Sequence, residues 1–385
     1  MKLRQTLLAT AVLGLLSTGA SAIDFGGYFR AGPGQKTTTG DSARCYNGST
    51  TNGHGGLGRL GNECHTYGEF ALGHSGEIGG VKFKALWMPS LFRDGSDPEG
   101  QTVKAAEQLY VEGKGFDIAP NQSFWIGKRY YHRADVHFDD AFFVNMTGMG
   151  AGVDGIPVGG GSLGLAVFRQ DDNGANPLSR FNADLENLAV NPGGKLRITL
   201  SLTEGSGSNG KSGSGISLQH NQAKLLAGGD NTLWVQYAQG SAGINMGSGT
   251  ATASSSVKTT LVADSLAWTD GPLSGQTLVQ FGEANDGTIK RKFNSIGGRV
   301  AYAMTNNFKL QAELGMNNSK PNGGASERVT KLTIAPTLTV GKNYYDRPEL
   351  RLYASYFSFN EAYKRANVLT KSNKTAIGAQ VEVWF

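Results

Sequence analysis

The densest group of reactive side chains is the segment 128–140, which reads KRYYHRADVHFDD. Six of its 13 residues are Lys, Arg or Asp, whereas charged residues make up 17% of the whole chain. Guanidinium and carboxylate groups both form hydrogen bonds with neutral hydroxyl groups, so this mixture suits a polyhydroxyl ligand such as a sugar. The segment also breaks the strand-like alternation of the chain. We therefore expect a loop that folds into the interior of a β-structure.

This segment has three other interpretations. A solvated surface loop with weak ion pairs explains the same composition and stays open. A metal site through His132 and His137 is disfavoured, because their spacing fits no zinc pattern and no third ligand is evident. A glycoside hydrolase pair at Asp139 and Asp140 is disfavoured, because adjacent side chains usually diverge. The sequence therefore predicts no catalytic residue, no metal site and no cofactor.

The elements that position this segment are strands with one apolar and one polar face. The clearest is the end of the chain, Ala376–Phe385, in which apolar and polar residues alternate without a break. Side chains of a strand point alternately to its two faces, and a closing strand that ends on an aromatic residue suits a transmembrane barrel. One aromatic residue, Trp384, lies on the polar face. The start, Ile23–Ala31, repeats this arrangement, with Tyr28 and Arg30 on the polar face.

Further segments alternate in the same way and carry Lys, Arg, Glu or Gln at mid-strand on one face. They are Glu63–Leu72, Lys195–Thr203, Phe308–Asn317, Lys331–Val340 and Glu349–Phe357. Charges inside and apolar residues outside favour a membrane barrel over a soluble secreted β-enzyme. With about 20 residues per strand and connection, the chain from residue 23 onward predicts about 18 antiparallel strands around an aqueous lumen.

The remaining features concern export. Residues 1–22 are expected to be a secretory signal peptide, with a basic start, the apolar run Leu7–Leu16 and a small-residue cleavage site at Ala20–Ala22. The barrel domain is expected over 23–385. In an exported chain, Cys45 and Cys64 are expected to form one disulfide. The net charge of +5, of which two units lie in the signal segment, is too small to indicate nucleic-acid binding.

Short motifs from one end of the chain to the other carry a family resemblance. They are Asp24–Tyr28, Arg59–Cys64 with Thr66 and Tyr67, Gly127–Arg129 with Arg133 and Asp135–His137, Gly150–Gly152, Asn191–Gly194, Val235–Ala238, Arg347-Pro348 and Gly378–Trp384. In these the chain resembles the maltoporins, which are 18-stranded trimeric sugar-specific porins of the Gram-negative outer membrane. The resemblance implies a homotrimer in outer-membrane lipid, with oligosaccharides as the solutes.

The resemblance also implies roles for individual residues. An aromatic slide for sugar rings is matched by Tyr28, Tyr67, Tyr345 and Trp384. A polar track and constriction are matched by Arg30, Arg59, Glu69, Arg133, Asp135, His137, Asp140 and Phe142. The cysteine pair matches a disulfide of the first loop. The implied function is facilitated diffusion of maltose and maltodextrins.

Four positions depart from the family pattern. Phe142 replaces a constriction tyrosine, and Glu107 stands where the polar track has an arginine. Asp230 replaces an inner phenylalanine of the slide, for which Trp234 could substitute. Phe92 is the candidate for the slide residue that a neighbouring subunit contributes. These departures leave the preferred sugar open. The alternative function is a general diffusion porin, whose inward aromatic residues only pack against the infolded loop.

Overall fold

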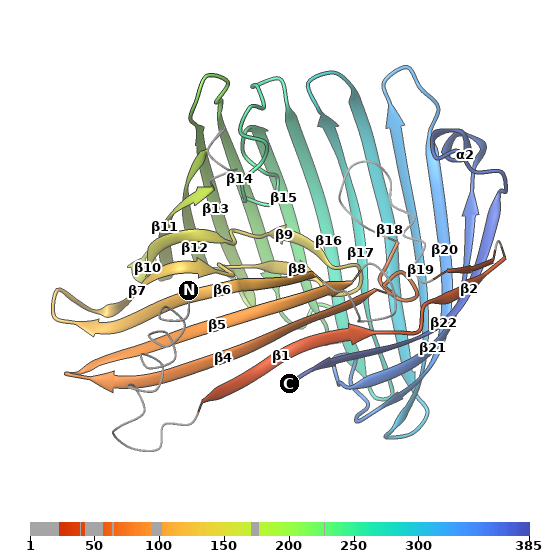
Figure 1. Ribbon diagram of the computed structural model, residues 1–385, viewed down its shortest axis with the longest axis horizontal. Coiled ribbons are helices and arrows are strands. Elements are labelled where there is room, and N and C mark those ends of the chain that lie inside the picture. Colours follow the sequence, from red (N-terminus) through yellow and green to blue (C-terminus); the bar gives the residue numbers. More distant parts are fainter. Residues whose placement is uncertain are drawn as a thin grey trace, which may run out of the picture.

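The strands close into a barrel (Figure 1). The computed structural model describes residues 23–38, 40–42, 57–63, 65–93, 102–170, 177–226 and 228–385. The expected signal peptide and both cysteines of the expected disulfide, Cys45 and Cys64, lie outside these residues. The main sheet has 20 strands, of which β2 and β3 are short additions beside β22, so the wall has 20 − 2 = 18 strands. The predicted antiparallel barrel of 18 strands is confirmed.

Successive wall strands pair antiparallel, and the last pairs with the first. The wall strands are β1 (Asp24–Ala31), β4 (Thr66–Ile78), β5 (Val81–Arg93), β6 (Thr102–Phe116), β7 (Ala119–Arg129), β10 (Gly148–Val158), β11 (Gly161–Gln170), β12 (Leu178–Asn191), β13 (Gly194–Gly205), β14 (Ser212–Gln222), β15 (Asp230–Gly240), β16 (Lys258–Asp270), β17 (Leu273–Asn285), β18 (Lys290–Ala303), β19 (Phe308–Pro321), β20 (Glu327–Thr339), β21 (Glu349–Phe359) and β22 (Asn373–Trp384). The other elements are β2 (Gln35–Thr37), β3 (Gly40–Ser42), β8 (Ala134–Val136), β9 (Ala141–Val144) and helix α2 (Glu361–Ala366). Closure places Tyr28 opposite Trp384 and Arg30 opposite Glu382. Among the described residues, no helix is long and apolar enough to cross a membrane.

The two ends of the barrel differ in their connections. At one end the strands are joined mostly by tight turns, such as residues 79–80 and 159–160. At the other end lie long connections such as 130–147, 241–257 and 360–372, the last of which contains α2 (Figure 1). In transmembrane barrels of bacteria the short turns face the periplasm and the long loops face outward. We call the two ends the short-turn end and the long-loop end.

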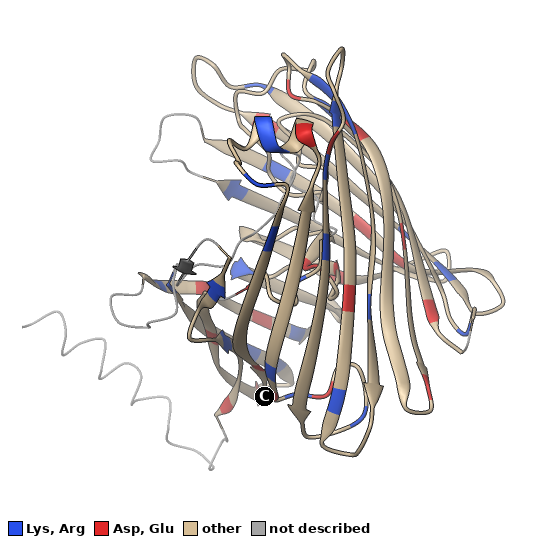
Figure 2. Cartoon of the chain, turned by 90° about the vertical axis from the view of Figure 1, so that its right-hand side faces the viewer, with Lys and Arg blue, Asp and Glu red and all other residues tan. Residues whose placement is uncertain are grey.

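The two faces of the wall carry opposite chemistry. On β21, Leu350 and Leu352 point outward and are 53% and 64% exposed. Their neighbours Glu349 and Arg351 point into the barrel and are only 1% and 3% exposed. Figure 2 shows the resulting charged residues at mid-height along several strands. An apolar outer face and a charged inner face reverse the order of a soluble protein and suit a wall in lipid.

Two segments fill part of the interior. The first contains the small sheet of β8 and β9, which does not pair with the wall. Its apolar side chains pack on an apolar patch of the inner wall from β15 to β18; the cluster is Val136, Phe138, Ala141, Phe143, Trp234, Leu261, Ala263, Leu278 and Phe293. The predicted infolding is therefore confirmed for residues 130–140, whereas Lys128 and Arg129 end the wall strand β7. The hydrophobic effect holds this loop inside an otherwise polar lumen.

The second inner segment, residues 57–63, is held by buried charges. Glu313 on β19 accepts hydrogen bonds from the Leu60 amide at 2.9 Å and from Lys331 Nζ at 2.7 Å. Lys331 Nζ also donates to the carbonyl oxygens of Gly58 and Leu60 at 2.8 and 2.7 Å. Arg299 donates to the other carboxylate oxygen of Glu313 at 2.7 Å. The backbone of this segment thus obtains its hydrogen-bond partners from the wall.

Lys331→Met is expected to lower the free energy of unfolding in detergent micelles by about 3 kcal/mol. The reason is that Glu313 keeps a buried charge with one partner fewer, and two backbone carbonyls lose their donor. The measurement is a urea titration followed by tryptophan fluorescence. Lys342→Met, at an exposed lysine near the short-turn end, is the control and should change stability by less than about 0.5 kcal/mol. Equal stability of the two variants would contradict the assigned anchor.

Candidate functional site

The inner segments and the wall enclose a cavity of about 670 Å³. Its walls come from β1, β4, β6 and β22 and from both inner segments. The lining residues are Tyr28, Arg30, Arg59, Tyr67, Glu69, Glu107, Tyr130, Arg133, Asp135, His137, Asp140, Phe142, Asn145, Thr147 and Trp384. Of the residues matched to the slide, the polar track and the constriction, all line this cavity except Tyr345. Residues far apart in the chain meet here because β22 closes on β1 and the segment 130–147 folds inward.

The aromatic residues form a path along the lumen. The rings of Tyr67 and Tyr28 lie 6.2 Å apart, and Tyr28 faces Trp384 across the β1–β22 pair. The His137 ring lies 5.5 Å from Trp384 and 5.6 Å from Tyr345. Tyr67 is near the long-loop end of β4, whereas Tyr345 belongs to a connection at the short-turn end. The path therefore runs from one opening of the barrel toward the other, and Tyr345 extends it beyond the cavity.

Arg59 joins the aromatic path to the charges around it. Its guanidinium donates to the Tyr28 hydroxyl at 2.8 Å and to Glu63 at 2.9 Å, and lies 3.0 Å from Glu382. Burial disfavours the cation, but Glu63 and Glu382 outweigh it and hold the pKa of Arg59 well above its ordinary value. Arg59 remains charged under all physiological conditions and fixes the hydroxyl of Tyr28.

His137 lies between two arginines. Arg59 contacts its Nδ1 at 3.2 Å and Arg347 contacts its Nε2 at 3.0 Å. Burial, together with the nearby guanidinium of Arg59, lowers the pKa of His137 well below its usual range. His137 is therefore neutral at physiological pH and offers a ring face beside Trp384, rather than a third positive charge.

Arg133 lies between two aromatic rings of the infolded segment. Its guanidinium carbon lies 4.2 Å from the centroid of Tyr130 and 4.2 Å from that of Phe142. The missing hydroxyl of Phe142 leaves this arrangement intact, because a cation–π contact needs only the ring. Tyr130 also donates to Glu69 at 2.7 Å, and the Tyr67 hydroxyl donates to the same carboxylate. The hydroxyl of Tyr130 is thus held by Glu69, and its ring in turn contacts Arg133.

Several lining residues were not in the expected set. Tyr130, Asn145 and Thr147 belong to the infolded segment. Of these three, Tyr130 was open to prediction from the sequence, because it is an aromatic residue inside the charged stretch 128–140. Glu107, noted only as a departure from the family pattern, lines the cavity. It accepts from Ser90 Oγ at 2.8 Å and pairs with Lys104 at 2.9 Å. Glu107 therefore places a carboxylate on this side of the lumen.

Two suggested substitutes for slide residues are wrong. Trp234 is 2% exposed, and its ring stacks on Phe143 at 4.3 Å, so it belongs to the packing under the β8–β9 sheet. Asp230 begins β15 at the short-turn end and is exposed. Phe92 pairs directly with Tyr67 and thus points to the inner side of its own barrel. Phe92 is not positioned as a residue donated to a neighbouring subunit.

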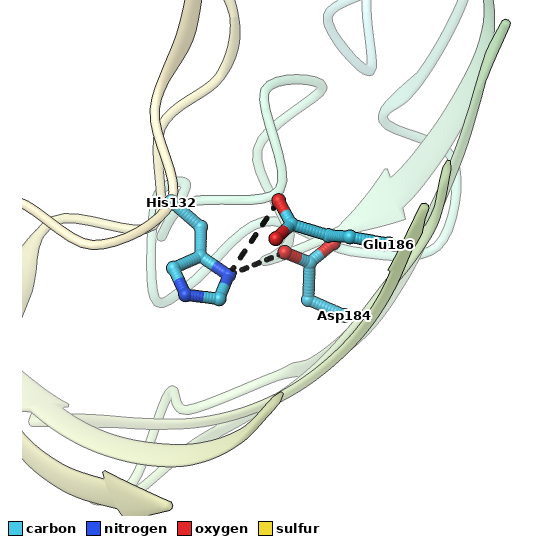
Figure 3. A group of neighbouring side chains, drawn as sticks. All are labelled: His132, Asp184 and Glu186. Atoms are coloured by element: carbon cyan, nitrogen blue, oxygen red, sulfur yellow. Dashed lines mark hydrogen bonds and ion pairs between the residues drawn. The ribbon is translucent and has the colours of Figure 1, made fainter. Parts of the chain in front are cut away.

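A second charged group lies around His132, at the root of the infolded segment (Figure 3). His132, Asp184 and Glu186 bring ligand atoms within 4.8 Å of one another. The Asp184 carboxylate already accepts from Arg197 twice at 2.9 Å, from Thr199 at 2.7 Å and from His132 at 2.5 Å. Arg197 supplies the positive charge that a metal ion would bring. The group serves as an ion-paired anchor between the segment 130–147 and the wall.

The wall and the site together define the class of this protein. An apolar outer surface, a polar lumen and an infolded loop that narrows it are the features of a transmembrane β-barrel porin. Over residues 23–385 the chain matches the model of the LamB porin family. The chain belongs to that family and is an outer-membrane porin.

Solved structures share the architecture at low sequence identity. OccAB1 of Acinetobacter baumannii aligns over 94% of this chain and 97% of its own, with a TM-score of 0.53 and 12% identity. The outer-membrane protein opdK of Pseudomonas aeruginosa aligns over 94% and 99%, with a TM-score of 0.51 and 10% identity. OpdL of Pseudomonas aeruginosa aligns over 94% and 97%, with a TM-score of 0.50 and 11% identity. At such identities the likeness shows the fold alone.

The buried carboxyl group of Asp139 should make the stability of the barrel depend on pH. Burial raises its pKa to about 7, so the unfolded chain loses this proton at lower pH than the folded barrel does. The contribution of Asp139 to the free energy of unfolding must therefore fall as the pH rises from about 4 to 7. Asp139→Asn should match the wild type near pH 4 and exceed it by about 4 kcal/mol at pH 8, since each unit of the pKa difference between the folded and the unfolded chain corresponds to about 1.4 kcal/mol. Urea titrations across this range measure the difference, with Asp117→Asn in an exposed turn as the control for net charge. A constant difference would contradict the raised pKa.

Proposed function

We propose that this chain is a sugar-selective porin for facilitated diffusion of maltose, maltodextrins or related oligosaccharides across the outer membrane. The observation that supports the proposal is the path from Tyr67 through Tyr28 and Trp384 to Tyr345. Hydrogen-bonding groups accompany this path along the cavity. The faces of glucosyl rings carry C–H groups and their rims carry hydroxyls, so an aromatic path beside polar side chains matches both.

The transport mechanism is passive. A sugar leaves water when aromatic faces contact its C–H surface and flanking polar groups replace its hydrogen bonds to water. Conduction requires several weak sites in a row, because a single tight site would trap the solute. The expected affinity is therefore millimolar, which corresponds to about 4 kcal/mol of binding free energy.

The charges around the cavity support discrimination between solutes. Arg30, Arg59 and Arg133 share the lining with Glu69, Asp135 and Asp140. Neutral polyhydroxyl compounds form hydrogen bonds with both kinds of group, whereas an ion of either sign meets repulsion from one of them. Arg347 lies 4.3 Å from the Trp384 ring centroid and so covers one ring face and holds the ring against the wall. The Trp384 side chain itself lines the cavity.

A general diffusion porin is the second candidate. The observation that favours it is that the aromatic hydroxyls are already engaged, since Tyr28 bonds to Arg59 and Glu382 and Tyr67 bonds to Glu69. In that case the rings are packing elements of the infolded loop. Current block by maltooligosaccharides separates the two functions, because a general pore has no sites that retain a sugar.

Further proposals rest on the sequence and the family. Residues 1–22 act as a cleavable export signal, Cys45 and Cys64 form a disulfide in the first loop, and the porin is a homotrimer. The chain transports rather than transforms its solute and needs no cofactor. Mass spectrometry of the mature chain, with and without reduction, tests the first two, and cross-linking in detergent tests the trimer.

Trp384→Ala is expected to raise the maltohexaose concentration for half block of single-channel current by about tenfold. Ion conductance should remain within about a fifth of the wild-type value, since removal of one ring hardly changes the polar cross-section. The measurement is current noise and block in planar bilayers.

Trp87→Ala is the matched control, because this tryptophan is 44% exposed on the outer face of the wall. Its sugar block should equal that of the wild type. A wild-type current that tens of millimolar maltohexaose leaves unchanged would overturn sugar selectivity. Parallel losses of block and conductance in Trp384→Ala would show that this residue is structural.

A further inference from the structure

Five cations gather on the outer face of the barrel at the long-loop end. They come from β16, β18, β19 and β20 and are Lys258, Lys290, Lys292, Lys320 and Arg328, which we call the rim patch. Their outward direction follows from the alternation along β18. Ile296, of the same parity as Lys290 and Lys292, is 50% exposed, whereas the intervening Phe293 and Ser295 are 6% and 5% exposed. These cations therefore do not face the lumen or the sugar path.

The strand register places like charges side by side. Lys292 on β18 pairs directly with Lys320 on β19. Like charges opposite each other in a β-ladder are destabilising. Glu283, which pairs with Lys292 from the other side, is bound by Lys290 at 2.7 Å. Among the residues that the structure describes, no ion pair is formed by Lys292, Lys320 or Arg328. Within the described residues, Glu283 is the partner of Lys290 alone, so the patch keeps an excess of positive charge.

A groove accompanies the charges. It has a volume of about 610 Å³ and is lined by Glu283, the three lysines at 290, 292 and 320, and the turn Pro321–Gly324. Its lining therefore combines three ammonium groups and one carboxylate with a turn at the end of β19. The groove has room for a phosphate group together with part of the molecule that carries it.

The height of the patch matches a membrane surface. Below Lys292 on the outer face of β18 come Asn294 and then Ile296, and below Lys320 on β19 come Asn318 and Met316. Four residues of a strand span about 14 Å, and a strand tilt of about 40° reduces this to about 10 Å of height. The ammonium groups therefore lie at the level of lipid headgroups, directly above the apolar band of the wall.

We propose that the rim patch binds the phosphate groups of the phosphorylated glycolipid in the outer leaflet, whose acyl chains lie against the apolar wall beneath. Lysine and arginine are the residues that bind phosphate, and basic clusters next to a membrane attract anionic headgroups. This site is separate from the lumen, so it stands whether or not the porin selects sugars. Bound lipid would remove the repulsion between Lys292 and Lys320.

The test compares two triple variants of the full chain purified in a zwitterionic detergent. The rim variant carries Lys290→Gln, Lys292→Gln and Lys320→Gln. The control carries Lys82→Gln, Lys84→Gln and Lys114→Gln at the short-turn end, where Lys82 also pairs with Lys114 and Lys84 pairs with Glu112. Binding of bis-phosphorylated lipid A is measured by calorimetry. The rim variant should bind on the order of a hundredfold more weakly than the wild type, and the control within about twofold.

Three outcomes would overturn the proposal. The first is equal affinity of the rim variant and the wild type, when both migrate as folded barrels before heating in gel electrophoresis. The second is undiminished binding of enzymatically dephosphorylated lipid A to the wild type. The third is equally tight binding of inorganic phosphate, which would assign the site to free phosphate rather than to lipid.

Discussion

The carboxylate of Glu313 holds the interior of this porin together. It is 0% exposed and binds Lys331, Arg299 and the Leu60 amide at once. A barrel of 18 strands is too wide to be filled by its own side chains, so chain segments must enter the lumen to narrow it. Such segments bring backbone groups that need partners. Buried charges on the inner wall supply them, and each charge is itself neutralised by a neighbour.

The two inner segments are held by different forces and then joined. Residues 57–63 depend on the charges around Glu313, whereas the β8–β9 sheet depends on an apolar patch that includes Trp234 and Leu278. The Arg59 amide donates to the Phe138 carbonyl at 3.0 Å, which connects one segment to the other. The side chain of the same arginine binds Tyr28 and Glu382 in the cavity. The residues that support the inner segments therefore also line the site.

The wall separates two kinds of polar surface. Inside, cations and carboxylates line the cavity together beside the aromatic path, which is the arrangement on which the proposed selectivity for neutral sugars rests. Outside, the rim patch carries an excess of cations above the apolar band of the wall, with Glu283 among them. The same residue types thus meet different surroundings, depending on which face of the strand they occupy. A shift of one residue along the strand moves a side chain to the opposite face.

The sequence by itself determined the wall, because a period of two is local and shows in Glu349–Phe357 or Ala376–Phe385 without knowledge of any neighbour. It also indicated the infolded segment, which interrupts that period with charges, and the family motifs named most of the residues that line the cavity. Only the tertiary structure decided which aromatic residues meet the lumen. Trp234 follows the same alternation as Tyr28, yet it is covered by Phe143, which is distant in sequence. The grouping of His132 with Asp184, and of Lys292 with Lys320, likewise depends on strand register and loop placement, since these are contacts between residues far apart in the chain.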